Sequence, residues 1–125
     1  MAAPEWIVSA VDGFGRATGL GGLAFDEKGA VSLAFENGFR FRMEYAFETL
    51  TVMMTLPFRD DDEAAKRLLL TAHPDARRPF RLRAAYLAKR GEAVLAVRLA
   101  EREVDRMALE TVFRGLWETA ERLKG

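Results

Sequence analysis

Residues 31–58 read VSLAFENGFRFRMEYAFETLTVMMTLPF, and apolar residues recur at every second position through most of this stretch. A period of two is typical of β-strands that bury one face. Asn37-Gly38 interrupts the pattern and predicts a hairpin closed by a type I′ turn. The strands after this turn are expected to bury Phe39, Phe41, Met43, Tyr45, Phe47, Leu50, Val52, Met54, Leu56 and Phe58. The pattern leaves open whether Glu48-Thr49 turns between two strands or lies in one bent strand, because neither residue favours a primed turn.

Upstream of this stretch the period changes to that of a helix. Apolar residues at spacings of four and three predict an amphipathic helix over residues 5–17. These residues are Ile7, Val11 and Phe14. The glycine-rich residues 19–22 end the helix. We expect residues 23–26 to form a short strand and residues 27–29 to form a turn.

Downstream, a second helix is expected from Asp60, which can cap its first turn, to about His73. Two strands follow, over residues 80–86 and 93–100. The last helix is predicted to begin after Asp105, a suitable N-cap. Its apolar stripe consists of Leu109, Val112, Phe113, Leu116, Ala120 and Leu123.

This order of elements predicts an α+β fold: a helix, three or four strands, a helix, two strands and a helix. Short turns between consecutive strands imply an antiparallel, twisted sheet of five to six strands, with three helices packed against it. The 125 residues suffice for one domain with its own core, and no linker or repeat divides them. We therefore predict a single domain over residues 1–125.

Composition excludes several classes of protein. Nineteen basic residues balance nineteen acidic ones, so no net field draws the chain to nucleic acid or to an anionic membrane. There is no cysteine, which excludes disulfides, thiolate metal sites and a cysteine nucleophile. The start of the chain, MAAPEWIVSA, lacks the pattern of a secretory signal, and no apolar run approaches the roughly 18–20 residues that span a bilayer. These features predict a cytoplasmic globular protein that is not inserted in a membrane.

Three patterns suggest a chemical site, and each has a simpler structural explanation. Residues 13–19 contain three glycines, but these close a helix and precede a strand, the reverse of a nucleotide-binding loop. The acidic residues 60–63 suit a helix N-terminus. His73 is the only histidine, and the two serines, Ser9 and Ser32, fall in a predicted helix and a predicted strand rather than in a triad. We therefore expect no enzymatic activity, no metal and no cofactor.

The stretch 77–90 is basic and contains Phe80 and Tyr86, so a single-stranded nucleic-acid-binding module is one alternative. Arg81 and Arg83, however, alternate with apolar residues. The charges and the rings therefore lie on opposite faces of the strand, whereas a stacking platform needs both on one face. We expect no nucleic-acid partner, and a salt-dependent shift of labelled single strands would contradict this expectation.

Several large apolar residues exceed what the predicted core can bury, and a surplus of this kind usually marks a partner surface. The strand expected at residues 23–26 would also offer unpaired backbone groups at a sheet edge. We predict that an extended polypeptide docks beside this edge and on the first helix, with the opposite face near Met53 as the other candidate. The predicted binding residues are Trp6, Leu20, Leu23, Phe25 and Met53.

Several short sequence segments occur along the chain in a characteristic order. They are GLGGL (19–23), FDEKG (25–29), VSLAFENG (31–38), TLP (55–57), LLLTAH (68–73), LETVF (109–113) and WETAE (117–121). Together, over about residues 6–123, they resemble the class I chaperones of type III secretion systems, the CesT/Tir chaperone-like family. Each segment alone is unspecific, and it is their order and spacing that carry the resemblance.

The resemblance implies a chaperone that binds the N-terminal segment of a cognate effector in the bacterial cytoplasm. Such a chaperone keeps the segment extended and soluble and delivers it to the secretion apparatus, which makes the secretion ATPase a further partner. It also implies a homodimer, for which we expect an interface containing Leu68, Leu69, Ala72, Ala85 and Leu87. An alternative is a protein-binding or regulatory domain of the same fold with no role in secretion, and binding of an extended peptide alone would separate the two.

Overall fold

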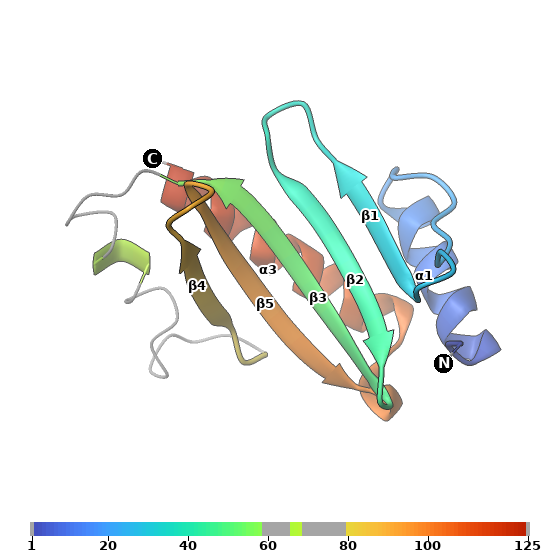
Figure 1. The fold of residues 1–125 in the computed structure, drawn as a ribbon. Coiled ribbons are helices and arrows are strands. Elements are labelled where there is room, and N and C mark those ends of the chain that lie inside the picture. Colours follow the sequence, from blue (N-terminus) through green and yellow to red (C-terminus); the bar gives the residue numbers. More distant parts are fainter. Residues whose placement is uncertain (1, 59–65, 69–79, 125) are drawn as a thin grey trace.

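The protein is described by a computed structural model, which covers residues 2–58, 66–68 and 80–124. Its elements follow the predicted order (Figure 1). They are α1 (Glu5–Ala17), β1 (Ala30–Ala34), β2 (Arg40–Ala46), β3 (Thr49–Pro57), β4 (Arg83–Leu87), β5 (Glu92–Ala100), the 3₁₀ turn η1 (Glu101–Glu103) and α3 (Arg106–Lys124). Of the second predicted helix, residues 66–68 are described and are helical.

The five strands form one antiparallel sheet in the order β1-β2-β3-β5-β4, so β1 and β4 are its two edges. The alternation read from the sequence is confirmed in the central strands, where every second side chain is buried. Phe41 of β2 pairs with Met54 of β3, and Met43 pairs with Val52. The predicted α+β class with an antiparallel sheet is therefore confirmed, with five strands in the described chain.

Both long helices lie against the same face of the sheet (Figure 1). Phe113 of α3 packs between Phe14 of α1 and Phe41 of β2, with ring centroids 5.6 and 5.0 Å apart. Asp105 caps α3 as predicted, because its Oδ1 accepts a hydrogen bond of 2.7 Å from the backbone N–H of Ala108. Trp117 belongs to this core, where its ring meets Phe39 edge-on at 5.1 Å. None of the described helices is long and apolar enough to cross a membrane.

The prediction of a strand at residues 23–26 is wrong, because the chain folds back over the last turn of α1 instead. Gly15 makes this possible: a Cβ atom there would lie 2.3 Å from the carbonyl oxygen of Gly21 and 2.7 Å from Cγ of Leu23. The N–H of Leu20 donates to the carbonyl oxygen of Gly15 at 2.8 Å. Leu23 is consequently a core residue with 6% of its surface exposed, rather than part of an edge strand.

The type I′ turn is present, but not where the sequence placed it. Such a turn needs positive φ at both central residues. At Asn37-Gly38 only the glycine has positive φ, 92°, and the N–H of Gly38 donates to the carbonyl oxygen of Phe35. This is a tight turn followed by a glycine bulge. The two-residue turn with positive φ at both positions joins β2 to β3, at Phe47 (51°) and Glu48 (57°).

This turn corrects a second prediction, which placed Phe47 on the buried face of the return strand. Phe47 lies beyond the last pair of the β2–β3 ladder, Ala46 with Thr49, and 90% of its surface is exposed. It also answers the question left open at Glu48-Thr49: the chain turns between two strands, and the turn begins one residue earlier.

Candidate protein-binding site

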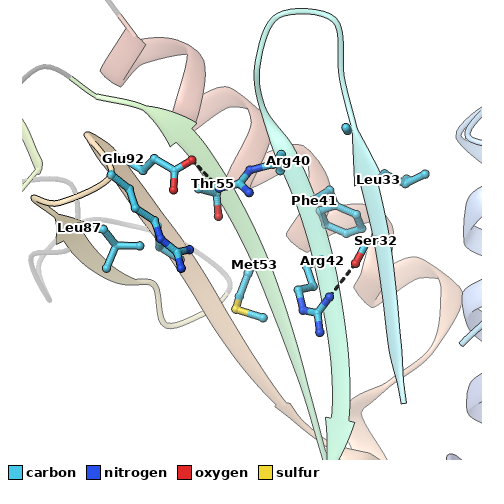
Figure 2. Close-up of a pocket in the computed structure, with 12 residues that line it drawn as sticks. Ser32, Leu33, Arg40, Phe41, Arg42, Met53, Thr55, Leu87 and Glu92 are labelled. Carbon is cyan, nitrogen blue, oxygen red and sulfur yellow. Dashed lines mark hydrogen bonds and ion pairs between the residues drawn. The ribbon is translucent and has the colours of Figure 1, made fainter. Parts of the chain in front are cut away.

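The face of the sheet opposite α1 and α3 is not covered by any helix within residues 2–58, 66–68 and 80–124 (Figure 1). A groove of about 460 Å³ crosses it from β1 to β4. Met53 of β3 lies near its middle, and Leu87 of β4 extends its apolar floor (Figure 2). Val94 of β5 also lines the groove. The lining residues are Ser32, Leu33, Ala34, Arg40, Phe41, Arg42, Met53, Thr55, Leu87, Arg90, Glu92 and Val94.

Charged side chains form the walls of this groove. Arg42 donates to Ser32 Oγ at 2.7 Å and to Glu44 at 2.5 Å, and Arg40 pairs with Glu92 (Figure 2). Oε1 of Glu92 is buried and has no hydrogen-bond partner among the described residues, so it can still accept a hydrogen bond from a bound molecule. An apolar floor between polar walls suits an amphipathic polypeptide.

The outer edge of β1 is the second feature of this region. The bonds from Tyr45 N–H to the Gly29 oxygen and from Phe35 N–H to the Phe39 oxygen fix the phase of the β1–β2 ladder. Odd-numbered residues of β1 therefore bond to β2, and the N–H and C=O groups of Ala30, Ser32 and Ala34 point outward. Among the described residues, no hydrogen bond reaches the outward backbone groups of Ser32 and Ala34.

Ala30 differs, because Asp26 occupies its edge position. The N–H of Ala30 donates to Oδ1 of Asp26 at 3.0 Å, and the N–H of Asp26 donates to the Ala30 oxygen at 2.8 Å. The Asp26 carboxylate also accepts the N–H of Lys28. Hydrogen bonds from Ala30 and Lys28 lower the pKa of Asp26 because they favour the charged carboxylate. The free edge is thus limited to two outward-facing residues.

The structure does not bring the predicted binding residues together in one place. Leu20 and Phe25 are half-buried beside the end of α1, and Leu23 is buried there. Trp6 lies at the other end of α1, with 48% of its surface exposed, and Met53 lies in the groove on the opposite face. A charged residue at Leu23 would therefore disturb the core, and the exposed positions are the ones suited to a binding test.

The predicted dimer residues divide in a similar way. Ala85 and Leu87 are exposed on the edge strand β4, whereas Leu68 is buried with 7% exposure. Leu69 and Ala72 lie outside the described residues, as do the acidic residues 60–63 and His73. In the described chain, no group of three or more His, Cys, Asp or Glu side chains could hold a metal ion.

The expected division of the basic strand is also present. Arg81 and Arg83 are exposed, while Phe80 and Tyr86 pack against the core. Tyr86 meets Phe58 edge-on at 5.8 Å. The charges and the aromatic rings therefore do not share a face that could stack nucleic-acid bases.

Sequence reasoning missed most of the groove, including Ser32, Arg40 and Glu92. The alternation in β2 placed its arginines on the uncovered face, and that was the available signal. The pairing of β3 with β5, which brings Glu92 and Val94 beside Thr55, joins residues about forty positions apart. No local pattern in the sequence predicts that pairing.

Comparison with known proteins assigns the family. A family model described as the Tir chaperone protein (CesT) family matches residues 9–124. The chain belongs to this family. It is thus an effector-binding chaperone of type III secretion, as the resemblance of its sequence implied. No curated protein sequence matches the chain.

Solved structures with the same fold include members of chaperone complexes. A chain of the ExsC–ExsE complex superposes with a TM-score of 0.76 at 17% identity, over 97% of this chain and 92% of that one. A chain of the HopA1–SchA chaperone–effector complex gives 0.71 at 21% identity, over 92% and 90%. The type III secretion chaperone SycH of Yersinia pestis, in complex with a fragment of YscM2, gives 0.71 at 16% identity, over 94% and 98%. At these identities the likeness establishes the fold.

Proposed function

We propose that this CesT-family chaperone binds the N-terminal segment of its effector as an added strand on the free edge of β1. The observation that carries the proposal is the pair of outward-facing residues Ser32 and Ala34, whose backbone groups have no partner among the described residues. Strand addition to an exposed edge holds a ligand extended through main-chain hydrogen bonds and selects it through side-chain pockets. The bound effector segment is thereby kept extended and soluble in the bacterial cytoplasm.

Apolar surface lies on both sides of this edge. α1 belongs to the helix layer and extends past β1, so an added strand would lie over it (Figure 1). On that side Leu20 and Phe25 are half-buried, and their exposed parts can receive client side chains. On the other side Ser32 and Ala34 border the groove that contains Met53. Alternate side chains of one strand point to opposite faces, so a single client strand can use both surfaces.

The proposal includes the assembly in which the chaperone works. The second edge of the sheet, β4, carries Ala85 and Leu87 on the surface, and we assign the homodimer contact to it. Delivery would follow by contact with the ATPase of the secretion apparatus. The chaperone itself catalyses no reaction, and each of these steps is a binding event.

The test replaces Ser32 or Ala34 with proline. Proline removes an N–H that points outward, and edge strands tolerate it because no ladder bond is lost. We expect Ser32→Pro and Ala34→Pro to weaken binding of the client segment by more than about tenfold, or roughly 1.4 kcal/mol. The matched controls Ser32→Thr and Ala34→Ser keep the N–H and should bind like the parent protein. The client segment is the N-terminus of the secreted protein that co-purifies with the chaperone or is encoded beside it.

Fluorescence anisotropy of the labelled segment measures the affinity, and circular dichroism verifies that each variant is folded. Equal affinity for the proline variants and their controls would remove strand addition from the proposal. The groove around Met53 would then be the remaining site, and Met53→Glu would test it directly.

A further inference from the structure

One end of the molecule collects features that the strand-addition site does not use. The β2–β3 turn, η1 and the start of α1 meet there (Figure 1), and the N–H of Glu101 donates to the Glu48 oxygen at 3.0 Å. A hollow of about 370 Å³ opens between these elements. It is lined by Trp6, Glu48, Ala100, Glu101 and Arg102. We call these residues, together with Phe47 of the turn, the acidic pole.

The acidic pole exposes aromatic surface. Phe47 is 90% exposed and Trp6 is 48% exposed, and both are among the five large apolar residues that the described chain leaves exposed. Exposed aromatic side chains with a polar surround are typical of anchor residues at protein interfaces.

Phe47 is also held in an unfavourable backbone conformation. Its φ of 51° and that of Glu48, 57°, lie in the left-handed region, where bulky side chains are rare. With 90% of its surface exposed, the ring makes little contact with the protein that could compensate. Backbone strain of this kind clusters at functional sites.

Negative charge gathers around these rings. Two carboxylates, Glu48 and Glu101, line the hollow, against the one guanidinium group of Arg102. The nearby carboxylates of Glu103 and Asp105 already accept the backbone N–H groups of Ala100 and Ala108. None of the ion pairs found in the described chain neutralises Glu48 or Glu101.

Tyr45 responds to this charge. Its hydroxyl donates to Oε1 of Glu101 at 3.2 Å. Burial raises the pKa of Tyr45, and the hydrogen bond and charge of Glu101, with the charge of Glu48, raise it further. Both carboxylates therefore act on the same hydroxyl, on a chain whose net charge is zero.

We propose that the acidic pole binds a second stretch of the same client, in which a lysine or arginine stands beside an aliphatic or aromatic residue. The cation would lie between the carboxylates and the Trp6 ring, which can also hold it through a cation–π contact. The apolar neighbour would pack on Phe47. This inference rests on the proposed function, because it assigns the pole to the client that adds to β1.

The distance between the two surfaces supports one client for both. Ser32 lies opposite Arg42, four residues before the end of β2 at Ala46. At about 3.3 Å per residue the turn is roughly 13 Å away along the strand. A strand added to β1 lies two strand spacings, about 10 Å, from β2, so an extended client would need about five residues to reach the pole.

The first test changes the pole and leaves the edge intact. We expect Phe47→Asn and Trp6→Gln each to weaken binding of the client segment by about five- to tenfold. Phe47→Tyr keeps the ring and should bind like the parent protein. Asparagine tolerates positive φ, so Phe47→Asn preserves the turn.

The second test concerns charge. The double variant Glu48→Gln/Glu101→Gln should lose affinity and show a weaker dependence on salt, because exposed charge pairs are screened by salt. Glu36→Gln, in the exposed β1–β2 turn at the other end of the strand, is the matched control. A synthetic peptide with lysines among leucines should shift the amide signals of Phe47, Glu48 and Glu101 in nuclear magnetic resonance. Its glutamine counterpart should leave them in place.

The outcomes separate this inference from the proposed function. If the proline variants of β1 have reduced affinity for the client segment and the pole variants bind it like the parent protein, the pole inference is wrong and strand addition stands. The opposite pattern supports the pole and rejects strand addition. If Phe47→Asn instead lowers the mass of the assembly in solution, the pole is a contact between copies of this chain, and the inference is overturned.

Discussion

Phe47 and Glu48 occupy a turn whose backbone suits other residues. Type I′ turns favour asparagine, aspartate and glycine, because both central residues need positive φ. We expect the double variant Phe47→Asn/Glu48→Gly to be more stable than the parent protein by about 1 kcal/mol, since strain of this kind costs roughly 1–3 kcal/mol per residue. Urea denaturation measures the difference.

Gly38→Ala provides the contrast to that variant. It would place a side chain at a φ of 92°, with its Cβ 3.3 Å from Cγ of Pro57, and should reduce stability. If the turn variant instead unfolds more easily, Phe47 has a packing role in the chaperone itself. The interpretation of the turn as a strained binding feature would then be wrong.

At the scale of an element, two glycines of α1 look alike in the sequence and differ in the fold. A Cβ atom on Gly13 would meet Cδ of Arg106 at 3.7 Å, an ordinary contact, whereas one on Gly15 would overlap the carbonyl oxygen of Gly21. We expect Gly13→Ala to stabilise the protein by about 0.5–1 kcal/mol through helix propensity. Gly15→Ala should destabilise it by about 1–3 kcal/mol.

Thermal unfolding of these two variants, each the other's control, checks the packing of the α1–β1 loop. Equal stabilisation by both would mean that residues 19–23 do not pack over the end of α1. The path of the chain into β1, and with it the position of Asp26 at the strand edge, would then need revision.

The elements themselves were largely predictable, because their signals are local. The spacing of Ile7, Val11 and Phe14 predicted α1 with the bounds that the structure has. Alternation predicted extended chain through β2 and β3 but left open whether it forms one bent strand or two. The turns were less predictable than the helices and strands. A type I′ turn at Phe47-Glu48 is imposed by the two-residue connection between paired strands, against the preference of both residues. The strand at residues 23–26 failed because burial of Leu23 against Gly15 outweighed a weak local pattern.

The binding surfaces were harder to predict for the same reason. Trp6, Leu20 and Phe25 are close in the sequence. Trp6, however, lies at the start of α1, whereas Leu20 and Phe25 follow its end. Glu48 and Glu101 meet because β3 pairs with β5 along its whole length. That contact depends on strand order, which the sequence pattern does not contain. The family, by contrast, was recognisable from short segments whose spacing follows the order of elements.

At the scale of the whole molecule, we assign different roles to the two edges of the sheet. In this proposal β1 binds the client, and β4 contacts a second copy of the chain. We predict a homodimer with a mass of twice 14.0 kDa and with Ala85 and Leu87 in the contact. Obligate dimers usually bury about 2,000 Å² or more, so these two side chains would form only part of the contact. Leu87→Glu should shift the assembly toward the monomer. Light scattering at micromolar concentration measures the mass, and a monomer for the parent protein would refute the prediction.

The shortness of the free edge of β1 has a bearing on how a bound client leaves. Ser32 and Ala34 together offer four backbone groups, because Asp26 already occupies those of Ala30. Four hydrogen bonds at roughly 0.5–1.5 kcal/mol each contribute about 2–6 kcal/mol. Ordering a flexible segment costs a similar amount, about 2–5 kcal/mol. The backbone contacts alone are therefore close to balance, and the affinity depends on a few side chains that can be withdrawn one after another. For the strand addition proposed above, we therefore expect unloading by gradual peeling from one end, without disruption of a long ladder.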